Sequence, residues 1–483
     1  MLLIDFFKNR NTLVGMNQRF EQLLEKGDIT AVKDRMVFRS SEVDEAIREY
    51  IPIMHNVMER RDKCVTDKSG KIVKTINVWK LPVPYQVFIN EIALVFLYGR
   101  PVKWSQVSDG TDEAFSAYLE RIKKLRFDSK IRQCKRLAGA ETESAMLFRT
   151  FQNENGKADC QIRVLARSKG DEIYTRFDQY ENLLAFAWGY YTLDDKDMQV
   201  YHFDIFTKDA TYKCTENENK WDVKKEPNII GKIPVIYFKQ EKEWAGAEKL
   251  IEREESIASR TADTNDYFAD PIAVLRGDVA KKMPDKEEAG KLLITNDQDG
   301  VNDAVKYLTW DSAPQSKKDE MEWLQTQIMQ KTFTPNITTE SLKSVSQLSA
   351  KALKTVMMLA DIKASKRKET HDELLDRCST LITSIIGNVL DVSLKGQCDK
   401  LQVAHEFQEP FGEDVADAIT NLIKCADAGI MSQESAIEMN PLVKDASREM
   451  ERIGQAQEEA TQRQLKLLTM QDNHAQTEEG TED

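Results

Sequence analysis

Residues 332–354 read TFTPNITTESLKSVSQLSAKALK, and this stretch separates two segments with helical patterns. The first pattern ends near Phe333, because Pro335 has no backbone N–H and cannot continue a helix. The second begins around Ser346, and its apolar stripe continues toward Leu390. Two packed helices need only about two to eight connecting residues. The extra small and polar residues indicate either a functional loop or a surface linker.

Upstream, two helical segments bracket a small β module. The segment 245–269 is helical in composition, but its apolar stripe is thin and lies among charged and hydroxyl residues. Such a helix packs on narrow seams between neighbours, as in a ring of helices, or lies solvated on a surface. Residues 270–315 contain three short strand-like runs and a small helical piece at 285–289, and the helical segment KKDEMEWLQTQIMQKTF follows.

The first half of the chain predicts helices followed by strands. Helical patterns cover NTLVGMNQRFEQLLEKGD, closed by Gly27, a segment capped by Ser40 or Ser41, and a buried segment ending at Gly99. The helical style continues from residue 114 to residue 152. Short runs rich in aromatic and β-branched residues then predict an antiparallel meander, closed by a strand over 233–238. The expected fold class is α+β, mainly helical.

The last part, from about residue 401, is helical and acidic. The pattern predicts a helix ended at Gly429, a helix capped by Ser432, and a third helix after Pro441. The final residues, DNHAQTEEGTED, are polar and acidic, and we expect disorder there.

Composition excludes several classes of protein. No apolar run approaches the roughly 18 residues of a membrane helix, and the N-terminal residues do not form a secretory signal. Seven scattered cysteines without a CxxC pair predict reduced, mostly buried thiols, and five histidines without ligand spacing give no metal site. A formal net charge of −13 disfavours a protein that grips DNA from outside. We expect no cofactor and no membrane partner.

Catalytic motifs are missing from the sequence. It has no GxxxxGK[ST] loop, no GxGxxG after a strand and no GxSxG elbow. Asp263, Asp266 and Asp270 lie close together and could bind Mg²⁺ in a metal-dependent nuclease, although such clusters are more often solvated helix ends. We therefore expect a protein that is not an enzyme and keep the nuclease as an alternative.

Three groups of residues carry a resemblance to a known family. The first is residues 231–277, with a closing Ile-Pro-Val strand, a long helix rich in Ala, Ser, Asn and Asp, and an apolar strand. The second is residues 329–358, where a Thr-Pro-Asn break is followed by an Ala-Leu-Lys sequence at which the helix restarts. The third is residues 428–453, which read AGIMSQESAIEMNPLVKDASREMERI. In this order they resemble the portal proteins of tailed bacteriophages, of the SPP1 type. One departure is Ala350, where the family often has a glycine, which removes a flexible position at the helix restart.

The resemblance implies a subunit of several parts, which carry the family's names. We expect a wing over residues 1–243, a stem helix over 244–269, a clip over 270–315, and a second stem helix over 316–334. A tunnel loop over 335–349 follows, then a long helix over 350–395, a helical crown over 396–470, and a disordered acidic tail over 471–483.

The resemblance also implies which residues act at each part. The tunnel loop would ring the DNA, with the candidates Asn336, Thr338, Thr339, Ser341, Lys343, Ser344, Ser346, Lys351 and Lys354. The stem would join subunits through Leu250, Ile251, Ile257, Trp323, Leu324 and Ile328. The clip candidates are Ile272, Val274, Arg276, Leu292, Ile294 and Tyr307. Truncating Trp323 or Leu324 should weaken assembly more than the subunit fold.

The implied function is a homododecameric ring at the unique capsid vertex, through which double-stranded DNA is packaged and ejected. The implied partners are other copies of the chain, double-stranded DNA, the major capsid and scaffolding proteins, the large terminase, and head-completion or adaptor proteins. The implied location is the virion, after synthesis in the host bacterial cytoplasm. A non-portal scaffold or adaptor of a phage particle is the other alternative, suggested by the helical acidic C-terminus.

Overall fold

The computed structural model describes most of the chain, in two compact units. The described residues are 20–67, 69–217, 220–269, 273–275, 305–307, 314–336, 350–410, 415–440, 442–443, 446, 448–458 and 460–462. The first unit covers residues 1–408 and the second covers 409–483. Each unit is described by itself below.

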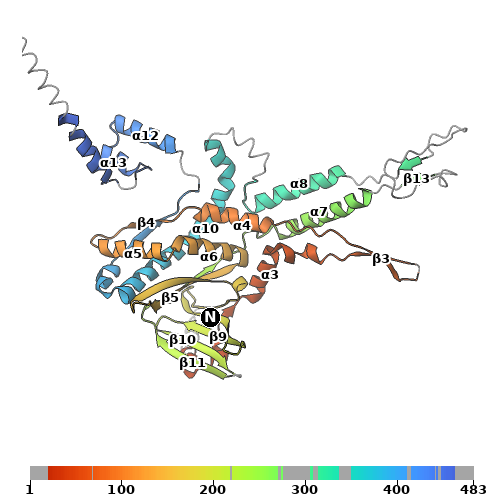
Figure 1. Cartoon of the computed structure of the whole chain (residues 1–483), viewed down its shortest axis with the longest axis horizontal. Helices are drawn as coiled ribbons and strands as arrows, with labels where there is room; N and C mark the ends of the chain where they lie inside the picture. The colour runs from red at the N-terminus through yellow and green to blue at the C-terminus, as the bar shows by residue number, and fades with distance from the viewer. Residues whose placement is uncertain are drawn as a thin grey trace, which may run out of the picture. The chain divides into compact units, whose positions relative to one another are not determined.

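Helices form one side of the first unit (Figure 1). After α2 (Ile29–Lys33) and α3 (Ser40–Tyr50) come short 3₁₀ turns, η1 (Pro52–Met54) and η2 (Asn56–Glu59), and later η3 (Arg167–Lys169). The helical layer contains α4 (Tyr85–Tyr98), α5 (Asp112–Lys124), α6 (Phe127–Glu141) and the long α10 (Ala350–Ile385). The stem candidates are α7 (Glu248–Ala269) and α8 (Pro314–Lys331). After α10 come a π turn (Ile386–Leu390), a 3₁₀ turn (Val392–Leu394) and α11 (Lys395–Cys398).

Two antiparallel sheets lie beneath the helical layer. The larger has the order β1-β7-β8-β9-β10-β11, formed by Val37–Phe38, Glu172–Phe177, Leu183–Leu193, Gln199–Phe206, Ala210–Asn217 and Lys220–Pro227. The smaller has the order β12-β5-β6, formed by Val235–Lys239, Glu143–Gln152 and Ala158–Leu165. Three two-stranded ribbons complete the set: β2 (Lys63–Thr66) with β3 (Ile72–Ile76), β4 (Lys103–Gln106) with β15 (Val403–Glu406), and β13 (Ala273–Leu275) with β14 (Val305–Tyr307).

Three apolar cores separate these layers. The first lies between the helices and the smaller sheet, where α10 buries Leu375, Cys378 and Ile382 against residues such as Phe127 and Phe148. The second lies between the two sheets, and the third lies between the larger sheet and the N-terminal helices. α10 is therefore a central core helix of this unit, because its apolar stripe faces the largest core.

The structure corrects three local expectations. The helical pattern over 114–152 breaks at Thr142, which has a φ of 67°, and residues 143–152 form β5 instead. Neither Ser40 nor Ser41 caps α3: Ser40 is already its first residue, Arg39 precedes it, and no side chain caps the end. The hairpin β2–β3 and the strand β11 were not predicted from the sequence. The meander is confirmed over residues 172–217, but the strands at 158–165 and 235–239, expected to belong to it, pair with β5 in the smaller sheet. The helix end at Gly99 agrees with the sequence pattern.

The second unit contains α12 (Val415–Asp427) and α13 (Gln433–Glu438). Gly429, with a φ of 69°, follows the first helix, and the Ser432 hydroxyl accepts a hydrogen bond from the Ser435 amide at the start of the second, as predicted. The segment 396–408 belongs to the first unit, since β15 pairs with β4.

Two composition-based expectations concern thiols and membranes. All seven cysteines lie among the described residues as free thiols, and five of them are buried. Within the described ranges, none of the helices combines the length and apolar character needed to cross a bilayer.

Candidate functional site

The paired helices α7 and α8 form the base of the candidate stem. Ile251 and Ile328 are buried in one cluster with Trp244, and Arg253 Nε donates to Glu320 Oε1 at 2.9 Å across the pair. Leu250 packs against the same cluster, so the structure brings together stem candidates from segments about 80 residues apart in sequence.

Two adjacent stem candidates have opposite environments. Leu324 is only 2% exposed, whereas Trp323 is 56% exposed. The expectation that Leu324 acts mainly in assembly is therefore wrong for the described subunit, because its side chain is buried within that subunit. Ile257 is also buried, at 5% exposure. Trp323 remains a candidate for contact with another subunit, since a large exposed aromatic side chain is typical of an interface.

The end of α8 shows how the interruption begins. The Thr332 hydroxyl donates to the Ile328 carbonyl at 2.8 Å and lies 3.0 Å from the Thr334 hydroxyl, and both threonines are buried. Phe333 between them has a φ of 52°, which L-residues seldom adopt. Capping by the two threonines and the following Pro335 end the helix at a fixed point.

An extended strap, residues 78–83, runs along α7 and is held by a regular ladder. The amides of Trp79, Leu81 and Val83 donate to Asp263 at 2.7 Å, to Ser259 at 3.0 Å and to Glu255 at 2.9 Å. Two extended residues span about 6.6 Å and four helical residues about 6.0 Å, so alternate amides match every fourth helical side chain.

Hydrogen bonds from the strap also involve two carboxylates of the acidic cluster that was considered as a metal site. Asp263 additionally accepts a hydrogen bond from Arg60 at 2.8 Å, and Asp266 accepts one from the Trp79 indole. Both carboxylates therefore bind the strap, while Asp270 lies outside the described residues. Within the part of the chain that the structure describes, no three His, Cys, Asp or Glu side chains are grouped as metal ligands.

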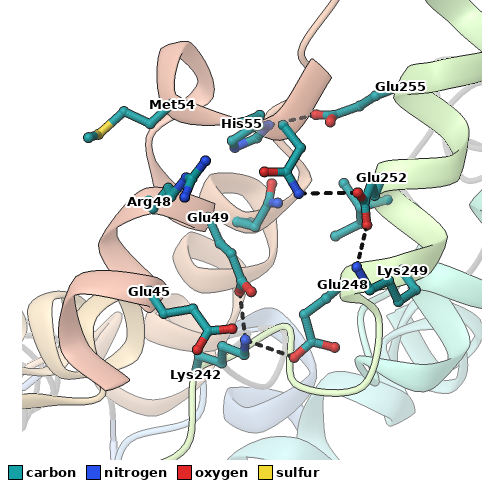
Figure 2. Close-up of a pocket in the computed structure, with 13 residues that line it drawn as sticks. Glu45, Arg48, Glu49, Met54, His55, Lys242, Glu248, Lys249, Glu252 and Glu255 are labelled. Carbon is teal, nitrogen blue, oxygen red and sulfur yellow. Dashed lines mark hydrogen bonds and ion pairs between the residues drawn. The ribbon is translucent and has the colours of Figure 1, made fainter. Parts of the chain in front are cut away.

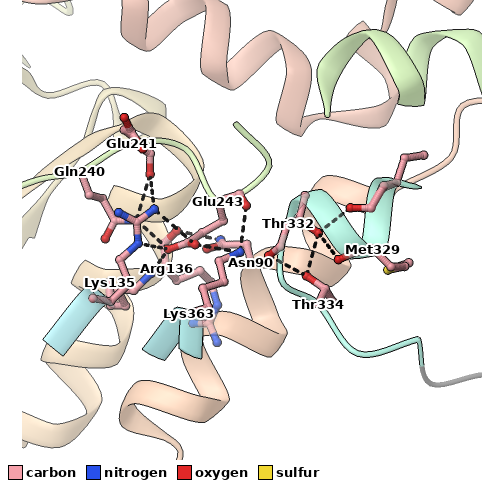
Figure 3. A network of polar contacts seen from close by, with 12 residues as sticks. Asn90, Lys135, Arg136, Gln240, Glu241, Glu243, Met329, Thr332, Thr334 and Lys363 are labelled. Carbon is pink, nitrogen blue, oxygen red and sulfur yellow. Dashed lines mark hydrogen bonds and ion pairs between the residues drawn. The ribbon is translucent and has the colours of Figure 1, made fainter. Parts of the chain in front are cut away.

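A buried charge cluster joins α6, α10 and the loop before α7 (Figure 3). The fully buried Glu243 carboxylate lies 2.5 Å from Lys135, 3.0 Å from Lys363 and 3.3 Å from Arg367. Burial alone would raise the pKa of Glu243, but the three cations outweigh burial and hold it well below its usual value. Burial lowers the pKa of Lys363 to about 8, against the opposing effect of Glu243.

The cluster fixes the segment that leads into α7 relative to α10. Lys363 also donates to the Glu243 carbonyl at 2.9 Å, and the next residue, Trp244, is fully buried with its indole 2.7 Å from Glu49. Sequence reasoning missed this cluster, because its members lie in segments separated by more than a hundred residues. A small signal exists in the sequence: Lys135 falls on the apolar face of a helical pattern.

Farther along α10, His371 is buried against α4. Its Nδ1 lies 2.9 Å from the Tyr98 hydroxyl, and the residue is only 2% exposed to solvent. Burial, together with the nearby cations Lys135 and Arg367, lowers the pKa of His371 from 6.5 to about 3, while Glu243 opposes the shift. The imidazole is therefore neutral in the folded subunit at neutral pH.

This neutral histidine predicts a loss of stability in mild acid. Between pH 6.5 and 3 the unfolded chain binds a proton at this site and the folded chain does not, so stability falls as pH falls, by up to about 1.4 kcal/mol per pH unit. Denaturant unfolding at several pH values should show a shallower dependence for His371→Gln than for the parent. Equal slopes in the two proteins would contradict the assignment.

The remaining candidates fall mainly outside the described residues. Asn336 is exposed beyond the end of α8, and Lys351 and Lys354 lie in the first turns of α10. Val274 and Tyr307 lie in the paired strands β13 and β14. The candidates outside the described residues are Thr338, Thr339, Ser341, Lys343, Ser344, Ser346, Ile272, Arg276, Leu292 and Ile294.

Comparison with known proteins identifies the class to which this arrangement belongs. The family model "Phage portal protein, SPP1 Gp6-like" matches residues 40–463, which is most of the chain, and the chain belongs to this family of phage portal proteins. A relative is the "Portal protein" of Bacillus phage SPP1, which is 24% identical over 448 residues, covering 86% of this chain and 83% of the relative.

Similar solved structures come from gene transfer agent particles. The chain from the "Neck of empty GTA particle computed with C6 symmetry" has a TM-score of 0.41 at 7% identity, over 84% of this chain and 95% of that chain. The chain from the "Virion of native gene transfer agent (GTA) particle" has a TM-score of 0.38 at 9% identity, with the same coverage. At these TM-scores the likeness does not establish a shared fold.

Proposed function

We propose that twelve copies of this chain form a ring at one vertex of a phage capsid, and that double-stranded DNA passes through its channel during packaging and ejection. Membership of the portal family supports this function. The same ring docks the large terminase and later the head-completion proteins, and it contacts the major capsid and scaffolding proteins. The chain is made in the host bacterial cytoplasm and becomes part of the virion.

The observation that carries the proposal is that both ends of the interrupting segment are anchored. Upstream, Thr332 and Thr334 are buried at the end of α8. Downstream, Met357 near the start of α10 packs in a buried cluster with Phe96 of α4. In this proposal, the segment between these two buried positions is the tunnel loop.

Charge favours passage of DNA over tight binding. Twelve copies at −13 each give a ring of about −156, which repels a polyanion at long range. Within residues 336–346, Lys343 is the single cation in the sequence, so a ring of loops would offer sparse, screened phosphate contacts. In this proposal α7 and α8 form the stem, and β13 and β14 belong to the clip.

Native mass spectrometry combined with negative-stain top views of the purified protein tests this proposal. The expected result is rings of about twelve subunits with a central hole near the ~20 Å width of a B-form duplex. A closed dimer or tetramer without a hole would contradict the proposal and favour the scaffold or adaptor alternative. Magnesium-dependent DNA cleavage that is lost in Asp266→Ala would instead favour a nuclease.

A further inference from the structure

The hairpin β2–β3 is exposed along the whole length of both strands. All nine residues of its two strands are exposed, and the ribbon pairs with no other strand in the described part of the chain. A two-stranded ribbon alone is at best marginally stable in water. Its turn is well formed, because Asp67 accepts from the Ser69 and Lys71 amides and Gly70 has a φ of 82°.

The surface of this hairpin is both apolar and basic. Val65, Ile72, Val73 and Ile76 are between 42% and 67% exposed. Residues 63–76 contain four lysines and a single aspartate, in a chain whose formal net charge is −13. A nucleic acid would satisfy the lysines but leave the aliphatic side chains in water, whereas an acidic protein surface with apolar contacts would cover both.

A surface with the complementary character lies at the other end of α7. A pocket of about 500 Å³ between α3 and α7, called here the α3–α7 pocket, is shown in Figure 2. Five carboxylates and three cationic side chains line it, together with Met54. Met54 is 45% exposed and the neighbouring Ile53 is 75% exposed, so the pocket adjoins apolar side chains.

Two polar groups of this pocket have no partner within the described residues, and one of them, the Glu45 carboxylate, is exposed. Glu45 has no hydrogen bond or ion pair among the described residues, although Glu49, Glu248 and Glu252 are paired with the two pocket lysines. The Oε1 atom of Gln86, whose side chain is 5% exposed, is buried without a hydrogen-bond partner in the described structure. A lysine or backbone N–H from another chain would give the unpaired Glu45 carboxylate a hydrogen-bond donor.

The two surfaces are separated within one chain. The hairpin leaves the strap beside Asp263 and Asp266, whereas the pocket is lined by α7 residues from Glu248 to Glu255. The 14 residues from Glu252 to Asp266 correspond to about 21 Å along the helix. Two different complementary patches on one chain produce head-to-tail contacts. Between identical subunits such contacts give a ring when the rotation between neighbours closes, and an open filament when it does not.

We infer that the hairpin β2–β3 of one subunit docks in the α3–α7 pocket of the next copy of the chain. Its aliphatic side chains cover Ile53 and Met54, and its lysines approach the pocket carboxylates. The inference rests on the ring assembly of the proposed function, and it assigns the subunit contact to the hairpin β2–β3 and to the pocket between α3 and the first part of α7.

Cys64, an exposed thiol in β2, allows a direct test. The full-length protein carrying Cys425→Ser keeps Cys64 as its one exposed cysteine, because the other five are buried. Benzophenone maleimide on Cys64, followed by irradiation, should give covalent dimers and higher multimers with attachment sites in residues 42–56 or 242–255. The same protein with Cys64→Ser should give none.

Two further variants test the chemistry of the contact. Ile72→Ser combined with Val73→Ser should lower the yield of covalent multimers about tenfold, through lost apolar contact. Glu45→Lys should lower it about threefold by placing like charges together. The matched control Glu154→Lys, at an exposed position in the β5–β6 turn, should leave the yield unchanged.

The outcomes separate this inference from the proposed function. Rings seen by native mass spectrometry, with photo-attachment elsewhere or within one subunit, would overturn the docking and leave the portal function intact. Capture of added double-stranded DNA in place of a subunit would also overturn it. A closed dimer or tetramer without a hole would contradict the proposed function, while attachment mapped to the pocket of another copy in that sample would still support the docking.

Discussion

Glu243→Gln should destabilise the subunit by about 3–5 kcal/mol, because it leaves three buried or nearly buried cations without their counter-ion. Lys135 is fully buried, and its pKa is already lowered by burial in spite of Glu243. The cations hold α6 and α10 against the loop that starts α7. The variant should therefore also loosen the start of α7. Urea unfolding at pH 7, with hydrogen exchange in α7 and α10, would measure both effects.

A neighbouring residue supplies the matched control for this experiment. Glu241→Gln makes the same chemical change two residues away, at an exposed side chain, and should alter stability by less than about 0.5 kcal/mol. Adding Lys135→Met to Glu243→Gln should recover part of the loss, since it removes one uncompensated charge. Equal unfolding midpoints for Glu243→Gln and Glu241→Gln would contradict the role assigned to the cluster.

Leu324→Ala should lower the stability of the subunit and Trp323→Ala should lower ring formation, although the two residues are adjacent in α8. Leu324 is 2% exposed, so its truncation leaves a cavity and should cost about 2–5 kcal/mol of subunit stability. Trp323 is 56% exposed, so its truncation should change subunit stability by less than about 0.5 kcal/mol. Its effect should appear in ring formation, because an aromatic side chain contributes strongly to an interface that covers it.

Both properties can be measured on the same samples. Thermal or denaturant unfolding under dilute, dissociated conditions gives the stability of the subunit, and mass photometry over a concentration series gives the fraction in rings. We expect Leu324→Ala to shift the first measurement and Trp323→Ala the second. Ring formation that is unchanged in Trp323→Ala would remove this side chain from the subunit interface.

Local sequence signals predicted those parts of the fold in which nearby residues determine the backbone conformation. Pro335 and the preceding threonines end α8, Gly99 closes α4, and Ser432 caps α13. Runs of aromatic and β-branched residues over 172–217 predicted strands that pair in sequential antiparallel order, as expected. These signals depend on φ, on missing amides or on side chains a few residues away, so they can be read without knowing the tertiary structure.

Tertiary structure decided that residues 143–152 form a strand, although their local preference is for a helix. Its residues ESAMLFRTFQ include several good helix formers, yet they form the central strand of the smaller sheet. The left-handed backbone at Thr142 ends α6, and pairing with β6 and β12 then satisfies both edges of β5. Hydrogen bonding and burial on two sides outweigh helix propensities of a few tenths of a kcal/mol per residue.

The sequence by itself therefore determined the α+β class, the antiparallel meander over 172–217, the position of the interruption and membership of the portal family. Only the tertiary structure decided which charges meet. Glu243 finds Lys135 and Lys363, and the amides of the strap find side chains on α7, across separations of more than a hundred residues. Such contacts leave no periodic signal in the sequence, because each depends on how the layers pack and not on the spacing of neighbouring residues.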